Sequence, residues 1–164
     1  MKTYQMLING KWVDAVSGAT FDDINPYTEE VYASVPLANA EDADKALAAA
    51  YAARKPWTAT SPTERSQILY NAAQIIQERQ QEFAQTLIAE GGSTFGKAMF
   101  EISQTVELLQ AAGADCKRIF GETFHTDPGK LSMTLLRPRG TVVAISPWNF
   151  PLILSMYKVA YSLA

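Results

Sequence analysis

The sequence predicts an α/β protein, and three observations lead to this prediction. Short β-rich segments come first, helical segments follow, and a β-branched run leads through a proline-flanked turn into a last helix. This order is typical of α/β folds rather than of helical bundles. A buried strand followed by one helix is half of a βαβ unit, because a parallel strand needs a second strand beside it. The sheet is therefore predicted to be incomplete within this sequence.

The first forty residues predict two pairs of strands. Asn9-Gly10 lies inside the apolar stretch 7–13, and both residue types tolerate the positive φ angles of a tight hairpin. Residues 23–26 and 31–35 form the second predicted pair, across a turn from Pro26 to Glu30.

Three helical segments are predicted next. Asn39 can cap the first, and Lys55-Pro56 is expected to close it. Ser61-Pro62-Thr63-Glu64 is a capping box that starts the second, which runs to Gly91-Gly92. The third is expected over 95–120. Apolar residues recur at helical spacing in all three segments. They are Ala43, Ala46, Leu47, Ala50 and Ala53 in the first, Ile68, Leu69, Ala72, Ile75 and Ile76 on one face of the second with Phe83 and Leu87 beyond them, and Met99, Ile102, Val106 and Leu109 on the stripe expected to be buried in the third.

The composition changes after the third helix. Residues 125–130 read as a turn-rich linker, and residues 131–137 alternate weakly, as a strand exposed on one face does. The β-branched run 141–146 predicts a buried strand, and 152–163 predicts a helix that starts at Pro151.

Composition excludes several functional classes. The 164 residues are 48% hydrophobic and 19% charged, with a net charge of −3 and no block of like charge, which argues against nucleic acid and anionic membranes as partners. A single cysteine excludes an internal disulfide and favours a reducing compartment. The N-terminus lacks the apolar core of a signal peptide, and no apolar run reaches the length of a membrane span, so a cytoplasmic protein is expected.

Most candidate reactive side chains have structural explanations. Cys116 is predicted mid-helix between Asp115 and Lys117, away from any strand-to-helix elbow or helix N-terminus that would activate a thiol, and His125 lies in a polar turn. No histidines or cysteines have metal-ligand spacing, and the glycines at 91–96 follow a helix instead of a strand, so neither a metal site nor a phosphate loop is expected.

Asn149, between Pro147 and Pro151, is the remaining candidate, and its residue type allows two roles. Asparagine is a preferred cap just before a helix, which is a purely structural role. An amide at the carboxyl end of a strand and beside a helix N-terminus can also stabilise a developing oxyanion. Spacing alone leaves the two roles evenly balanced.

The segment Gly140-Thr141-Val142-Val143-Ala144-Ile145-Ser146-Pro147-Trp148-Asn149-Phe150-Pro151-Leu152, followed by Lys158, resembles the signature of the NAD(P)-dependent aldehyde dehydrogenases. The resemblance extends over nearly the whole sequence. It includes Ile8-Asn9-Gly10-Lys11-Trp12, the turn at 25–31, Asp44, Ala46 to Ala50, Trp57, Arg65 and Glu90-Gly91 in the family's order. Gly91-Gly92-Ser93-Thr94 is more similar to the branch that oxidises aromatic aldehydes, such as benzaldehyde.

This resemblance implies a reaction and a set of site residues. The family oxidises an aldehyde to an acid through a cysteine thiohemiacetal, hydride transfer to NAD or NADP, and thioester hydrolysis. Asn149 would be the side-chain donor of the oxyanion hole, and Lys158 would be a buried lysine behind the site with a structural or proton-relay role. Ile145, Ser146, Pro147 and Trp148 would line the cofactor site, and Phe150 and Tyr157 would flank the substrate tunnel.

The resemblance also implies an organisation. Residues 1–124 would form the N-terminal part of the cofactor-binding domain, 125–139 a strand segment of the oligomerisation arm, and 140–164 the first strand–turn–helix of an incomplete Rossmann-like fold. A homo-oligomer, dimer or tetramer, is implied for the full-length enzyme.

Two departures from the family qualify the resemblance. Glu29 stands where the family's turn usually has glycine, and Cys116 does not match the position of the nucleophile. The nucleophile and the general-base glutamate are expected beyond Ala164, so this chain alone is predicted to be inactive. Two alternatives remain at this point: a non-enzymatic module that associates with full-length subunits through the arm, and an unrelated α/β protein in which Asn149 only caps a helix.

Overall fold

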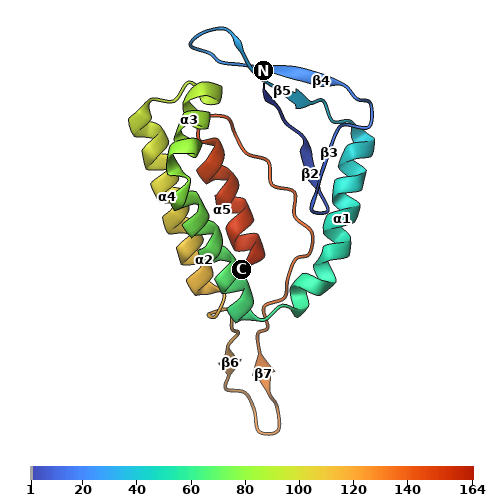
Figure 1. Cartoon of the computed structure of the whole chain (residues 1–164). Coiled ribbons are helices and arrows are strands. Elements are labelled where there is room, and N and C mark those ends of the chain that lie inside the picture. The colour runs from blue at the N-terminus through green and yellow to red at the C-terminus, as the bar shows by residue number, and fades with distance from the viewer. Residues whose placement is uncertain (1) are drawn as a thin grey trace.

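The computed structural model describes residues 2–164 as a helical bundle beside a layer of short strands and one long helix (Figure 1). The strands are β1 (Lys2–Thr3), β2 (Met6–Ile8), β3 (Lys11–Val13), β4 (Thr20–Ile24), β5 (Val31–Pro36), β6 (Thr123–Phe124) and β7 (Ser132–Met133). The helices are α1 (Ala40–Ala59), α2 (Pro62–Glu78), α3 (Gln80–Gly91), α4 (Phe95–Asp115) and α5 (Pro151–Leu163). The predicted α/β class is confirmed.

The predicted N-terminal hairpin is confirmed. Strands β2 and β3 pair antiparallel, with Ile8 opposite Lys11 at the turn. Asn9 and Gly10 have φ angles of 52° and 72°, the left-handed conformation that a two-residue hairpin turn requires at both positions.

The second predicted strand pair is also confirmed. Strands β4 and β5 pair antiparallel, with Phe21 opposite Val35, and β1 adds a parallel strand, with Lys2 opposite Ala33. The order in this sheet is β1-β5-β4. The turn between β4 and β5 places Glu29 at a φ of 61°.

Helix α1 begins as predicted but ends later. The Asn39 side chain accepts hydrogen bonds from the first-turn amides, which makes it the N-cap. The predicted end at Pro56 is wrong, because the helix continues through this proline to Ala59. The missing amide falls in the last turn, where Thr58 and Thr60 donate their hydroxyls to backbone carbonyls. The apolar residues at helical spacing in α1, which are Ala43, Ala46, Leu47, Ala50 and Ala53, are all exposed.

The second predicted helix is two helices. Ser61 and Glu64 form the expected capping box at the start of α2. The helix breaks at Arg79, whose φ and ψ of −99° and 17° are not helical. The Arg79 guanidinium binds Glu82 with an Nε–Oε2 distance of 2.9 Å, which favours a new start because an acidic residue is stabilised in a first helical turn. Gly92, in a left-handed conformation with φ of 63°, ends α3.

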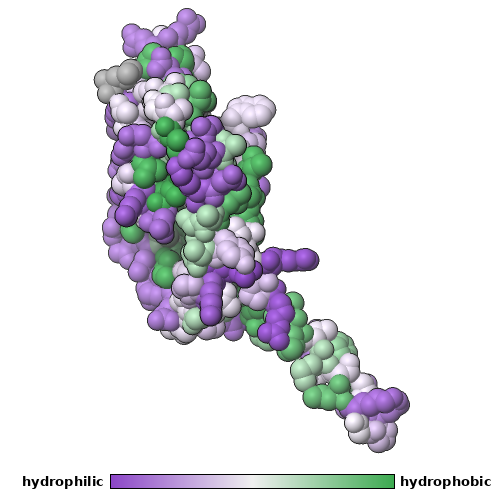
Figure 2. All heavy atoms as spheres, turned by 90° about the vertical axis from the view of Figure 1, so that its right-hand side faces the viewer, coloured by the Kyte–Doolittle hydropathy of each residue, from purple (hydrophilic) through white to green (hydrophobic). Residues whose placement is uncertain are grey.

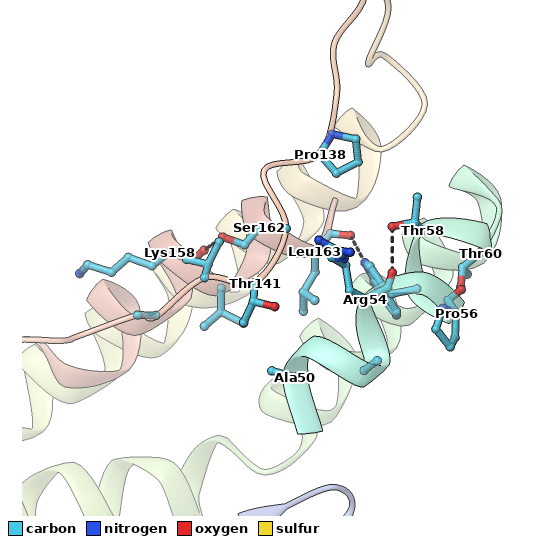
Figure 3. A pocket seen from close by; sticks show the side chains of 16 residues that line it. Ala50, Arg54, Pro56, Thr58, Thr60, Pro138, Thr141, Lys158, Ser162 and Leu163 are labelled. Carbon is cyan, nitrogen blue, oxygen red and sulfur yellow. Dashed lines mark hydrogen bonds between the residues drawn. The ribbon is translucent and has the colours of Figure 1, made fainter. Parts of the chain in front are cut away.

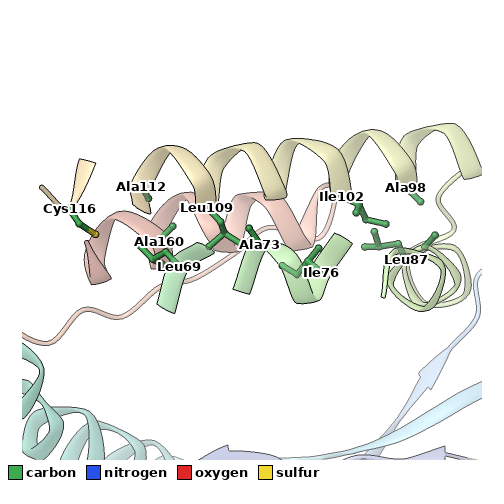
Figure 4. Close-up of a cluster of buried hydrophobic side chains, with 11 residues drawn as sticks. Leu69, Ala73, Ile76, Leu87, Ala98, Ile102, Leu109, Ala112, Cys116 and Ala160 are labelled. Carbon is green, nitrogen blue, oxygen red and sulfur yellow. The ribbon is translucent and has the colours of Figure 1, made fainter. Parts of the chain in front are cut away.

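The core lies between α2, α4 and α5, with one end closed by α3 (Figure 4). Its buried residues are Leu69, Ala73, Ile76, Ala84, Leu87, Ala98, Ile102, Leu109, Ala112, Cys116 and Ala160. Five of these are alanines, which lets the helix axes approach closely. Ile102 and Leu109 are buried as predicted, whereas Ile68 and Ile75 are exposed, because the buried stripe of α2 runs through Leu69, Ala73 and Ile76.

The segment after α4 differs most from prediction. Helix α4 ends at Asp115 and does not reach residue 120. Strand β7 covers only Ser132–Met133 of the strand predicted over 131–137, and it pairs with β6 in a hairpin that projects from the body (Figure 2). The buried strand predicted at 141–146 is wrong. This segment is extended but pairs with no described strand, and Val143 is 67% exposed.

Candidate functional site

The candidate site is the turn that leads into α5. Trp148 and Asn149 form the turn, Phe150 is the N-cap residue with φ of −141° and ψ of 68°, and Pro151 is the first helical residue, where its missing amide costs nothing. Asn149 therefore precedes the cap position, and no side chain of residue 150 caps the helix. Of the two roles that its residue type allows, Asn149 does not fill that of the α5 cap.

The N-terminus of α5 is capped by Glu101 of α4. Its Oε1 accepts hydrogen bonds from the backbone amides of Leu152 at 2.7 Å and Ile153 at 3.2 Å. The Glu101 side chain is completely buried. A carboxylate that accepts two amides at a helix N-terminus is stabilised by these hydrogen bonds and by the helix dipole. The start of α5 is thus fixed to the middle of α4.

Lys97, one turn before Glu101, contacts the same region. Its Nζ lies 3.9 Å from Glu101 Oε2 and 4.5 Å from the ring centroid of Phe150, and it donates a 2.8 Å hydrogen bond to Ser93 Oγ. A lysine at this distance over an aromatic ring makes a cation–π interaction. The residue that directly follows Asn149 is therefore tied to α4.

Two serine hydroxyls, one before the turn and one after it, donate to the same backbone carbonyl. Ser146 Oγ donates to the carbonyl of Pro151 at 3.1 Å, across the turn, and Ser155 Oγ donates to the same carbonyl at 2.6 Å. Asn149 itself makes no side-chain hydrogen bond within the described chain and is exposed. Its amide is held on a fixed turn and is available for an external partner.

The four residues expected at the cofactor lie along the exposed strand-like segment and turn. Ile145 is 78% exposed and Trp148 is 89% exposed, while Ser146 and Pro147 are half-buried. Large apolar side chains with this exposure are suited to contact with a bound partner or ligand.

Tyr157 and Lys158 lie on the exposed part of α5, two turns beyond Asn149. Tyr157 is exposed, whereas Phe150, the N-cap residue of α5, is half-buried and lies against Lys97 of α4. The prediction of a buried lysine is wrong for this structure, because Lys158 is exposed and donates a 3.0 Å hydrogen bond to the carbonyl of Leu154. Lys158 faces the segment 138–144 and the end of α1 across a cavity.

The far end of α5 is anchored separately. Trp57 Nε1 donates to the carbonyl of Leu163 at 3.2 Å, and Tyr161 donates its hydroxyl to Asp115 Oδ2 at 3.3 Å. Burial raises the pKa of Tyr161, and the neighbouring Asp115 carboxylate raises it further, so the phenol remains a neutral donor.

A cavity of about 520 Å³ lies between the end of α1, the segment 138–144 and the exposed side of α5 (Figure 3). Arg54, Trp57, Thr141, Lys158 and Ser162 are among its lining residues, whereas Asn149 is not. The lining residues come from the end of α1, the segment 138–144 and α5. This cavity is therefore distinct from the Asn149 turn.

Other chemistries have little support in residues 2–164. Cys116 is 2% exposed and lies in the hydrophobic core, a setting typical of structural cysteines. No cluster of potential metal ligands occurs in this part of the chain. Over the same residues, no helix combines the length and the apolar character that crossing a membrane requires.

Sequence reasoning missed Glu101 and Lys97. One signal was present: Glu101 is a charged residue on the apolar stripe of α4, next to Ile102 and one turn before Thr105, which is also buried. A carboxylate at such a position needs a specific partner, because an unpaired buried charge is costly.

Comparison with known proteins gives a consistent assignment. The model of the aldehyde dehydrogenase family matches residues 12–164. The chain is 39% identical to the vanillin dehydrogenase of Corynebacterium glutamicum over 159 residues, which cover 96% of this chain and 33% of that protein. It is 35% identical to the 3-sulfolactaldehyde dehydrogenase of Pseudomonas putida over 161 residues, 98% of this chain and 33% of that protein.

A solved structure of similar fold is that of an NAD-dependent benzaldehyde dehydrogenase from Corynebacterium glutamicum. It superposes with a TM-score of 0.91 at 38% identity, over 97% of this chain and 35% of the other. The chain thus spans about a third of the length of the relatives it matches. The family resemblance noted in the sequence is confirmed, and its cofactor is NAD or NADP.

Proposed function

Because this chain belongs to the aldehyde dehydrogenase family, we propose that it supplies the oxyanion-binding amide and part of the cofactor site for oxidation of an aldehyde to a carboxylic acid. The observation that carries this proposal is the exposed Asn149 amide, which has no partner in residues 2–164, on a turn fixed from both sides.

Asn149 is the donor in this proposal, and the helix N-terminus is not. The amides of Leu152 and Ile153 are already committed to Glu101. The Asn149 N–H₂ group therefore remains to hydrogen-bond the aldehyde oxygen as negative charge develops on it. One such donor contributes about 10²–10³ in kcat in other enzymes.

The residues before Asn149 fit a nicotinamide cofactor. Ile145 and Trp148 present exposed apolar surface, and Ser146 and Pro147 give the segment a fixed shape, so these four residues would hold the nicotinamide end of NAD or NADP. The bound cofactor would supply the hydride acceptor. The role of this chain is to place that cofactor beside Asn149 and to shield it from water.

We assign the substrate class by the aromatic side chains on α5. Phe150, at the start of α5, and Tyr157, on this helix, would form an apolar wall beside Asn149, which suits an aromatic aldehyde. The vanillin and benzaldehyde dehydrogenases among the relatives support this class. Lys158 follows Tyr157 on α5, and we propose for it a structural or proton-relay role.

The nucleophile in this proposal is not Cys116, because this thiol is buried in the core away from the turn. We therefore expect no turnover by the 164-residue chain with benzaldehyde and NAD or NADP. Turnover that survives Cys116→Ala would contradict this expectation.

A chimera provides the direct test of Asn149. Residues 1–164 replace the corresponding third of the Corynebacterium glutamicum vanillin dehydrogenase, and benzaldehyde oxidation is followed by NADH absorbance. Asn149→Ala is expected to lower kcat by about 10²-fold or more, with a small change in the KM for NAD. Asn71→Ala, on the exposed face of α2, is the matched control and should leave kcat unchanged. A loss of less than about threefold for Asn149→Ala would refute the assignment.

A second role is favoured by the projecting hairpin of β6 and β7. The hairpin projects from the body (Figure 2) and its apolar residues are exposed, with Phe124 at 48% and Leu131 at 75%. We propose that this hairpin associates with other copies of the protein. Light scattering of the chain and of Leu131→Lys tests it: a discrete oligomer that the substitution dissociates supports the role, and an unchanged mass contradicts it.

A further inference from the structure

A buried carboxylate connects α4 to the residues that follow Asn149. Glu101 lies on the apolar stripe of α4 and is completely buried. Its Oε1 accepts from Leu152 and Ile153, 51 and 52 residues further along the chain. Its Oε2 makes no hydrogen bond with any described residue and has Lys97 Nζ at 3.9 Å as its charged neighbour.

Lys97 extends this connection to the turn itself. Its ammonium group lies over the Phe150 ring at 4.5 Å and donates to Ser93 Oγ at the start of α4. Glu101 thus fixes the backbone three and four residues after Asn149, and Lys97 fixes the side chain directly after it. Ser146 closes the turn from the other side through the Pro151 carbonyl.

We propose that Glu101 and Lys97 are positioning residues that set the direction of the Asn149 amide in the reaction. This inference rests on the proposed function of Asn149 as oxyanion donor. Its physical basis is that a donor of this kind acts only when it is preorganised, and a displacement of about 1 Å can cost about 10²-fold in rate.

A purely structural role for Glu101 predicts that its substitution changes stability and not the chemical step. A buried charge pair can often be replaced by apolar residues without loss of stability, so packing does not require a carboxylate here. If Glu101 only stabilised the bundle, its substitution would lower stability without a specific effect on the chemical step.

The matched control is Asp42, another buried carboxylate that caps a helix. Its Oδ1 accepts from the Val16 amide and its Oδ2 from the Asn39 amide, both at 3.0 Å, at the start of α1. Asp42→Asn alters a capping carboxylate of similar burial in the strand and α1 part of the molecule, without contact to the Asn149 turn.

The first experiment uses the 164-residue chain and needs no activity. Amide hydrogen exchange is measured by NMR at Leu152 and Ile153. Glu101→Ala is expected to speed exchange at both amides by at least tenfold, and Glu101→Gln, which keeps a carbonyl oxygen as acceptor, should speed it less. Equal exchange in the wild type and Glu101→Ala would overturn the proposal.

The second experiment measures kinetics in the chimera described above. Glu101→Ala is expected to lower kcat by about 10–100-fold with little change in KM, Glu101→Gln to restore most of this loss, and Asp42→Asn to have no effect on kcat. The decisive measurement is the double variant. Because Glu101 acts through Asn149, Glu101→Ala should cause no further loss in the Asn149→Ala background.

The outcomes separate the two proposals. Full additivity of Glu101→Ala and Asn149→Ala would overturn the positioning role while leaving the oxyanion donor intact. An active Asn149→Ala variant would refute the donor assignment, and with it the catalytic part of this inference, whereas the exchange experiment still reports on the contact. If Glu101→Ala does not fold, Lys97→Met carries the same kinetic and double-variant test, with an expected loss of about tenfold.

Discussion

The replacement of Glu29 by glycine should stabilise the turn between β4 and β5. Glu29 has a φ of 61°, and an L-residue in this left-handed conformation costs about 1–2 kcal/mol. Glycine removes this cost but loses about 0.5–1 kcal/mol through the entropy of the unfolded chain. Since the exposed Glu29 side chain makes no hydrogen bond or ion pair with the described residues, the backbone terms decide the result. We expect a net gain of about 0.5–1 kcal/mol.

The neighbouring residue provides the control. Glu30 is also an exposed glutamate, but its φ is not positive, so Glu30→Gly brings only the entropic loss of about 0.5–1 kcal/mol. Both variants keep the backbone hydrogen bonds of the turn, in which Glu29 N–H donates to Asn25 O and Asn25 N–H to Glu30 O. Two adjacent glutamates are therefore expected to respond with opposite sign.

Thermal unfolding followed by far-UV circular dichroism measures the difference. For a chain of this size, Glu29→Gly should raise Tm by about 2 °C and Glu30→Gly should lower it by a similar amount. Amide exchange in the β4–β5 ladder reports the same change locally. Shifts of the same sign in the two variants would refute the assignment of strain to Glu29.

Three further predictions concern other elements. Ser61→Ala removes the side-chain acceptor of the α2 capping box and should lower the free energy of unfolding by about 1 kcal/mol in urea denaturation. Gly121→Ala would place a Cβ in collision with the Thr134 carbonyl, so amide exchange in the β6–β7 hairpin should accelerate, whereas Gly96→Ala, with open space around it, should leave exchange in this hairpin unchanged. Burial raises the pKa of Glu90 above its ordinary 4.5, which means that the folded state binds this proton more tightly than the unfolded state and that stability falls as the pH rises through the raised value. Glu90→Gln should therefore have a higher free energy of unfolding than the wild type at pH 7. This difference between variant and wild type should vanish below about pH 4, as urea denaturation at pH 7 and below pH 4 would show.

Local signals in the sequence predicted local structure well. Asn9-Gly10, Asn39 and the Ser61–Glu64 capping box each specify their own turn or helix start through hydrogen bonds to residues within a few positions. The Pro151 start of α5 is of the same kind. These features require no information about distant parts of the chain, which is why the sequence was sufficient.

Features that depend on tertiary contacts were predicted less well. Pro56 does not end α1: it lies in the last turn, where Thr58 and Thr60 donate to backbone carbonyls and Trp57 donates to the Leu163 carbonyl of α5. The run 141–146 has strand-like residues, but a parallel strand exists only with a partner, and the described chain offers none. Periodicity also could not show which apolar stripe of α2 is buried. The adjacent residues Ile75 and Ile76 are both apolar, but only Ile76 is buried.

The candidate site shows the same division. The Asn149 turn was found from its residue pattern, whereas Glu101, which caps the helix in place of Asn149, could be found only from the packing of α4 against α5. Whether Asn149 and the cofactor-side residues perform their proposed roles stays a prediction for the kinetic experiments.

The unpaired segment 141–146 has a consequence for handling this chain. Thr141-Val142-Val143-Ala144-Ile145-Ser146 combines high β-propensity with no charge and no proline, and its backbone pairs with no described strand. Such a segment is a template for intermolecular strand addition, which ends in cross-β stacking when identical copies meet. Concentration of the 164-residue chain should therefore drive fibrillar or amorphous self-association that begins at this segment, and a dye that reports cross-β structure should detect it before the helices unfold.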